Sequence, residues 1–239
     1  MVDALSDGIA RVLRAPAILT GTIALVILYG PHHDLRHTAG AMVLWAFLSG
    51  GVLDRYARRR PTRARGFFGA CGGHSGAMLR LGLACVLVMA AFHLAIGGGF
   101  PNAYVHEAAF VAALAMALAV SIAQVRVAVE DRRSALGALL AGGRFVIRNP
   151  AVIALFVLFT AAFLGVMLAG ERAGAAVPDG WRAQTAAGLF VAVECFLLLA
   201  WYASATSLFQ SRLAHAAYTA APPLEWPESP AAEAIANRR

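Results

Sequence analysis

The sequence predicts an all-α fold: an integral membrane bundle of about six transmembrane helices with short amphipathic helices at the membrane surface. Hydrophobic residues make up 60% of the 239 residues, and the mean hydropathy is +0.68. Only 14% of the residues are charged, against roughly 25% in a soluble domain. The apolar residues also form long blocks, as helices that cross a bilayer require. The chain therefore has too few charges to cover a water-soluble surface.

Six apolar blocks are separated by short polar connectors. They cover about 15–30, 38–53, 77–97, 104–125, 151–169 and 185–209. A helix needs about 20 residues to cross the hydrocarbon core. The first two blocks are shorter than this, so we expect them to include flanking residues such as Val12, Leu13 and Leu35.

The arginines give the orientation of these helices. There is no Lys, and alternate connectors are rich in Arg, so that 17 arginines fall on one side and 3 on the other. An excess of Arg marks the cytoplasmic side of a membrane. We therefore expect both termini in the cytoplasm. Arginines that lie beside apolar blocks also argue against nucleic-acid binding.

An internal repeat links residues 4–17 to residues 138–151. Seven positions are identical at an offset of 134, among them Gly8 with Gly142, Arg14 with Arg148 and Pro16 with Pro150. Each copy predicts a short amphipathic surface helix that leads into a span. The repeat also favours retention of residues 1–30, which otherwise resemble a signal peptide.

Two further features extend this repeat to three copies. A third surface element, Gly-rich and a poorer helix, is expected at about 62–76, and an Arg-x-Ala triplet follows each even span, beginning at Arg55, Arg126 and Arg212. These features predict three copies of a helical-hairpin unit within a single transmembrane domain, residues 1–219. Residues 220–239 are predicted to form a Pro-rich cytoplasmic tail.

Several segments resemble a family of uncharacterised bacterial membrane proteins with six spans. The resemblance rests on residues 50–57 (GGVLDRYA), 129–133 (VEDRR), 209–216 (FQSRLAHA) and 226–231 (WPESPA). It implies a six-span topology and supplies no catalytic residues. The family has a longer segment between the first two spans, where this chain has seven residues, 31–37.

Glu194 is the leading candidate for an intramembrane polar site. It lies about nine residues into the last apolar block, where a charged side chain costs about 2.5–3.5 kcal/mol even on the lenient insertion scale. We expect it to face other helices, in protonated form and with a hydrogen-bond partner. His93, His106 and Glu107 could join it in the outer half of the membrane, although His106 and Glu107 also fit a helix end at the headgroups.

Other polar clusters have simpler interpretations. Arginines near the cytoplasmic ends of the spans could bind lipid headgroups or dock an acidic partner, or only set topology: Arg58, Arg59, Arg60, Arg63, Arg132 and Arg133. His32, His33, Asp34 and His37 fit a solvated turn better than a metal site. Cys71, Cys85 and Cys195 form no CxxC pair, so they are expected to be buried, and no metal or other cofactor is predicted.

Three hypotheses about function remain open. The first is a non-enzymatic membrane subunit: a scaffold or assembly partner of a larger membrane complex, or a homo-oligomer. The second is a small transporter or channel-like protein that uses Glu194. The third is a membrane enzyme acting on lipid, with His93 or His106 as a base. No GxSxG, Walker A, HExxH or Rossmann motif is present, which favours the first.

Overall fold

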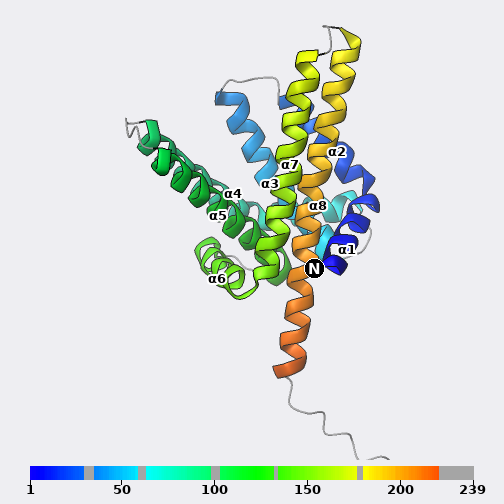
Figure 1. The fold of residues 1–239 in the computed structure, drawn as a ribbon. Coiled ribbons are helices and arrows are strands. Elements are labelled where there is room, and N and C mark those ends of the chain that lie inside the picture. Colours follow the sequence, from blue (N-terminus) through cyan, green and yellow to red (C-terminus); the bar gives the residue numbers. More distant parts are fainter. Residues whose placement is uncertain (30–34, 59–62, 98–102, 132–133, 177–179, 221–239) are drawn as a thin grey trace, which may run out of the picture.

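The computed structural model is a bundle of helices (Figure 1). It describes residues 1–29, 35–58, 63–97, 103–131, 134–176 and 180–220. Within these ranges there are eight helices: α1 (Val2–Leu13), α2 (Pro16–Tyr29), α3 (Leu35–Arg58), α4 (Ala64–Gly97), α5 (Ala103–Glu130), α6 (Ala135–Arg148), α7 (Pro150–Ala176) and α8 (Trp181–Ala220).

The two copies of the sequence repeat fold alike. α1 ends at Leu13 with Arg14 as its C-cap, and α2 begins at Pro16; α6 ends at Arg148 with Asn149 as its C-cap, and α7 begins at Pro150. Proline suits the first turn of a helix because its missing N–H would have no partner there. Ser134 caps α6, since its hydroxyl accepts a hydrogen bond from the Gly137 N–H at 3.2 Å. Each short amphipathic helix therefore turns sharply into a long apolar one.

Three helices form the centre of the bundle. α3, α5 and α8 contact one another, and their buried side chains belong to one continuous core, including Leu53, Ile122, Val125, Leu199 and Ala203. Trp45 of α3 and Tyr202 of α8 stack at 6.2 Å, and Tyr202 donates a hydrogen bond to the Gln124 side-chain oxygen of α5 at 2.7 Å.

A surface segment covers each central helix at the same end of the bundle. α1 packs on α8, the start of α4 packs on α3, and α6 packs on α5. Small residues allow the close approach: a Cβ on Gly8 would lie 2.6 Å from the Ser204 backbone nitrogen, and one on Gly142 would lie 3.1 Å from that of Ala123. We call this end, which carries α1, α6 and the carboxyl ends of α3 and α5, the arginine-rich end.

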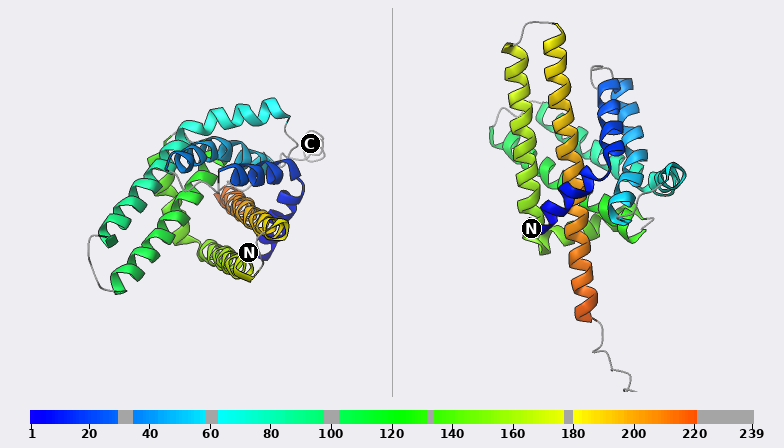
Figure 2. Two further views of the ribbon diagram at one scale, coloured as in Figure 1. Left: turned by 90° about the horizontal axis from the view of Figure 1, so that it is seen from above. Right: turned by 90° about the vertical axis from the view of Figure 1, so that its right-hand side faces the viewer.

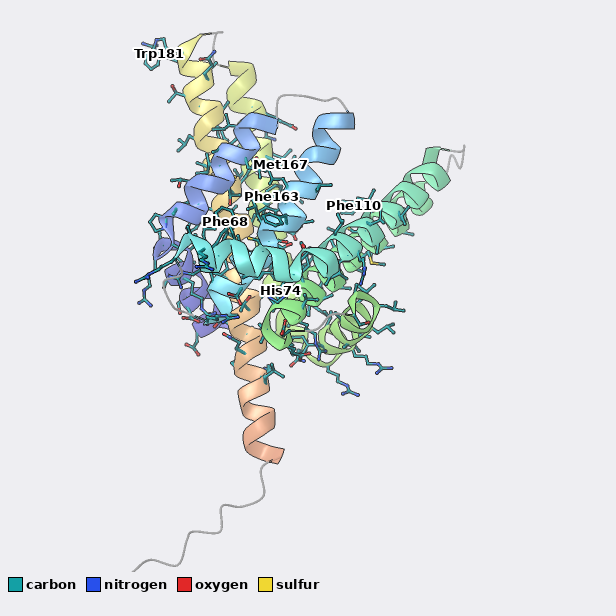
Figure 3. All side chains as sticks on the ribbon, turned by 180° about the vertical axis from the view of Figure 1, so that it is seen from behind. Phe68, His74, Phe110, Phe163, Met167 and Trp181 are labelled. Atoms are coloured by element: carbon teal, nitrogen blue, oxygen red, sulfur yellow. The ribbon has the colours of Figure 1, made fainter. Side chains whose placement is uncertain are left out.

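The segment expected at 62–76 is not a separate, poorer helix. α4 begins at Ala64 and continues without a break to Gly97. Its first part, which carries Phe68 and His74, runs across the molecule before the helix rises (Figure 3). The helix runs through Gly72, Gly73 and Gly76 without a break. A Cβ at any of these positions would meet no atom within 4 Å, so no neighbouring element packs closely against them.

Four helices are long and apolar enough to cross a membrane within the described residues. They are α4, α5, α7 and α8, and α1 with α2 would add a fifth span if that pair, bent by 79°, counts as one. α8 has 40 residues, about 60 Å at a rise of about 1.5 Å per residue. Its carboxyl end extends beyond the rest of the bundle (Figures 1 and 2). We call residues 211–220 the projecting end of α8.

Candidate functional site

A buried arginine joins three helices at the arginine-rich end. Arg11 of α1 is only 6% exposed. Its Nη1 donates to the Tyr56 carbonyl of α3 at 2.6 Å and to the Gln210 side-chain oxygen of α8 at 3.2 Å. Its Nε and Nη2 donate to Asp7 Oδ2 at 2.9 and 2.6 Å. A charge removed from water needs such partners, so this network fixes α1 against the central helices.

Two neighbouring side chains complete the network. The Ser207 hydroxyl donates to Asp7 Oδ2 at 2.6 Å, and the Gln210 amide donates to the Ala57 carbonyl at 2.8 Å. Asp7 therefore accepts from both α1 and α8, and Gln210 links α8 to α3. This network has a structural role, because every polar atom named here already has a protein partner.

A second polar region lies between α3, α4 and α5. A cavity of about 290 Å³ is lined by Asp54, Arg58, His74, Asp131 and Gln210, among others. Asp54 accepts a hydrogen bond from Arg58 Nε at 2.7 Å. His74 Nδ1 lies 3.9 Å from Asp131 Oδ1, too far for a hydrogen bond. No group of three potential metal ligands occurs among the described residues.

Another cavity lies between α2, α3 and the start of α4. It has a volume of about 540 Å³ and contains two charged residues, Arg14 and Arg55. The other lining residues are mostly apolar: Ala15, Pro16, Ala17, Ile18, Gly21, Thr22, Leu25, Trp45, Leu48, Val52, Ala64, Phe67 and Phe68. We call this cavity the lateral groove. One of its two arginines, Arg14, lies at the corner where α1 turns into α2.

Glu194 lies in α8 and is half-buried. Among the described residues, no hydrogen bond from another helix reaches its carboxyl group, so the expected partner is not found there. The four cavities that stand out around the bundle are lined by other residues. Glu194 thus has no lining position in these cavities.

The expected polar cluster around Glu194 stays a prediction. Residues 93, 106 and 107 belong to α4 and α5, and the end of α4 and the start of α5 diverge from the outer parts of α7 and α8 (Figures 1 and 2). Glu107 is exposed, which agrees with a helix-end position. The side chains of His93 and His106 lie outside the described part of the structure.

The structure describes two of the six arginines considered as lipid or partner docking residues. Arg58 is bound to Asp54 with its side chain 67% exposed, and Arg63 is exposed just before α4. Arg59, Arg60, Arg132 and Arg133 lie outside the described residues, as do His32, His33 and Asp34 and residues 221–239 of the tail.

Comparisons with known proteins returned no match: no protein-family model, no curated protein and no solved structure is similar to this chain. Membership of the six-span family therefore stays a prediction. Function has to be argued from the geometry of this structure alone.

Sequence reasoning missed the Arg11 network and the lateral groove. One local signal for the network was present, because Asp7 and Arg11 are four residues apart on an amphipathic helix, the spacing at which helical side chains meet. Nothing local marked the partners on α3 and α8, which are 45 and 199 residues away. The groove depends on the packing of three helices and has no motif.

Proposed function

We propose that this chain is a non-enzymatic membrane scaffold, a subunit or assembly partner of a larger complex. In this proposal it resides in the bacterial inner membrane with six spans and both termini in the cytoplasm. The concentration of arginines in alternate connectors supports that orientation. The similar packing of α1, α6 and the start of α4 supports three copies of one unit.

The projecting end of α8 is the observation that carries the proposal. Residues 199–209 form a continuous run of buried positions, whereas Ser211, Arg212 and Leu213 are exposed. The helix continues to Ala220, beyond the other helices of the bundle (Figure 1). Here it leaves the contacts that hold the rest of α8. A helix that continues past its own core offers a surface for another protein.

The central helices favour a scaffold over a transporter. The core between α3, α5 and α8 contains fully buried apolar and small side chains, such as Ile122, Leu199 and Ala203. Close packing of this kind makes a rigid support. Glu194, the residue on which a transport mechanism would depend, lines none of the four cavities described above.

Truncation of the chain tests the proposal. Full-length protein, a chain ending at Ala220 and a chain ending at Leu213 are purified in mild detergent, and native mass spectrometry identifies stoichiometric partners or oligomers. Because Gln210 and every position of α8 that the structure describes as buried are retained, the three chains should unfold at similar temperatures. The partner should remain with the chain ending at Ala220 and dissociate from the one ending at Leu213.

Two results would contradict the proposal. The first is a full-length chain that purifies as a monomer with no stoichiometric partner. The second is an assembly that survives removal of residues 214–239 unchanged, which would place the docking surface elsewhere.

A further inference from the structure

We propose that the lateral groove binds one anionic phospholipid, with its phosphate between Arg14 and Arg55 and one acyl chain along α2. The inference rests on the membrane placement proposed above and goes beyond the scaffold function. Charged and apolar residues occupy different parts of the groove. The two arginines lie at one end, and the other lining residues with a polar side-chain group are Thr22 and Trp45. The Thr22 hydroxyl already donates to the Ile18 carbonyl at 2.9 Å, so apart from the Trp45 indole N–H the rest of the groove presents apolar surface.

The charge at this end lacks a matching carboxylate. Other arginines are paired within their own helices: Arg58 with Asp54 at 2.7 Å and Arg126 with Glu130 at 2.8 Å. Among the residues that the structure describes, no ion pair or hydrogen bond links Arg14 or Arg55 to an acid. The position equivalent to Glu130, four residues beyond Arg55, is itself an arginine, Arg59.

A small polar cavity extends this positive end. It has a volume of about 70 Å³ and is lined by Asp7, Arg11, Arg14, Arg55 and Tyr56. Three arginines and one aspartate give these residues a net charge of +2. Since Arg11 is engaged with Asp7, Tyr56 and Gln210, Arg14 and Arg55 supply the donors. Guanidinium groups bind phosphate oxygens through paired, charge-assisted hydrogen bonds.

The dimensions of the groove fit one lipid chain. The lining runs from Ala15, just before α2, to Leu25, and these ten residue-to-residue steps span about 15 Å. That length is half of the roughly 30 Å hydrocarbon core, the depth of one leaflet. The volume of about 540 Å³ also falls within the range of roughly 300–1,000 Å³ seen for small-molecule sites. The second acyl chain would stay in the surrounding bilayer.

The sequence repeat supplies a matched control for Arg14. Arg148 is the last residue of α6 and Arg14 is the C-cap of α1, and each lies two residues before the proline of its copy. Both arginines are exposed, and they have the same local setting. Arg148 does not line the groove. A specific lipid site therefore distinguishes the two, whereas general attraction to an anionic membrane does not.

The test compares an anionic lipid with a zwitterionic lipid that has identical acyl chains. Phosphatidylglycerol or phosphatidylcholine is added to the full-length protein in detergent, and bound lipid is counted by native mass spectrometry. We expect about tenfold preference for phosphatidylglycerol, from two cations acting on one anionic headgroup. The double variant Arg14→Gln with Arg55→Gln should lose this preference, and Arg148→Gln should keep it.

Two further measurements examine the apolar part of the groove. Gly21 lines the groove, and a Cβ there meets no atom within 4 Å, so Gly21→Phe places a ring in the space of the acyl chain and should weaken binding of both lipids severalfold. Glycerol phosphate, which has no acyl chain, should not displace the lipid at equal concentration. The proposal is overturned if Gly21→Phe binds lipid normally, if glycerol phosphate competes equally, or if Arg148→Gln loses the preference as fully as the double variant. A wild-type protein without headgroup preference would also overturn it, and would leave the truncation experiment on α8 unaffected.

Discussion

Replacement of Arg11 by Ala should separate α1 from the centre of the bundle. The side chain of Arg11 is 5% exposed, and its guanidinium donates to the Tyr56 carbonyl and to Gln210. A hydrogen bond from a charged group contributes about 1.5–3 kcal/mol. The ion pair with Asp7 adds less, because the Asp7 side chain is 30% exposed and solvent screens the attraction. We expect the free energy of unfolding to fall by about 3 kcal/mol.

Arg58→Ala is the matched control for this substitution. Arg58 also pairs with an aspartate four residues earlier, but its side chain is 67% exposed. Water in the adjacent cavity of about 290 Å³ can replace the lost bond to Asp54. Because the Asp54 side chain is only 6% exposed, the loss should exceed that of a fully exposed pair, about 1 kcal/mol, but stay below the loss for Arg11→Ala, which removes two bonds to other helices.

The assay is equilibrium unfolding in mixed detergent micelles, followed by tryptophan fluorescence. Trp201 is buried in the core against Phe156 and Phe159, so its emission reports loss of the core. If the free energies of unfolding of Arg11→Ala and Arg58→Ala differ by less than about 1 kcal/mol, the network contributes no more than a surface ion pair, and the reasoning is refuted.

Three further predictions concern packing, topology and Glu194. Gly8→Ala should destabilise the protein by about 1–3 kcal/mol through overpacking, because the new Cβ would lie 2.6 Å from the Ser204 backbone nitrogen. Gly143→Ala, where a Cβ meets nothing within 4 Å, should instead stabilise it by about 0.5–1 kcal/mol. Equal effects of the two substitutions in thermal unfolding would contradict this prediction. In a variant lacking the three native cysteines, Thr62→Cys should resist a membrane-impermeant thiol reagent in intact cells and Asn102→Cys should react; efficient labelling at position 62 would reverse the topology. Glu194→Leu should raise stability, by up to about 2.5–3.5 kcal/mol, and Glu194→Gln should change it little; loss of stability in the Leu variant would reveal a hydrogen-bond partner beyond the described residues.

Local patterns in the sequence predicted the helices well. The apolar blocks at 104–125, 151–169 and 185–209 lie within α5, α7 and α8, since the length and hydropathy of a helix are properties of consecutive residues. The repeat likewise located two amphipathic helices followed by proline. The number of spans stays a prediction, because α3 is not among the four long apolar helices found in the described residues.

The candidate site depended on contacts that no local pattern contains. Glu194 drew attention because a carboxylate in an apolar block is expensive, yet the structure places the end of α4 and the start of α5 away from the outer part of α8 (Figure 1). Arg11, by contrast, looked like one more surface arginine of an amphipathic helix.

By itself, the sequence determined which segments are helical and apolar, where two amphipathic helices turn into longer ones at Pro16 and Pro150, and where the arginines gather. Only the tertiary structure decided that Arg11 reaches Tyr56 and Gln210, and that α2, α3 and α4 leave a groove beside Arg14 and Arg55. The physical reason is one of range. Helix formation and hydropathy depend on neighbours within a few residues, whereas the seating of one helix on another depends on a few side chains that are distant in the chain.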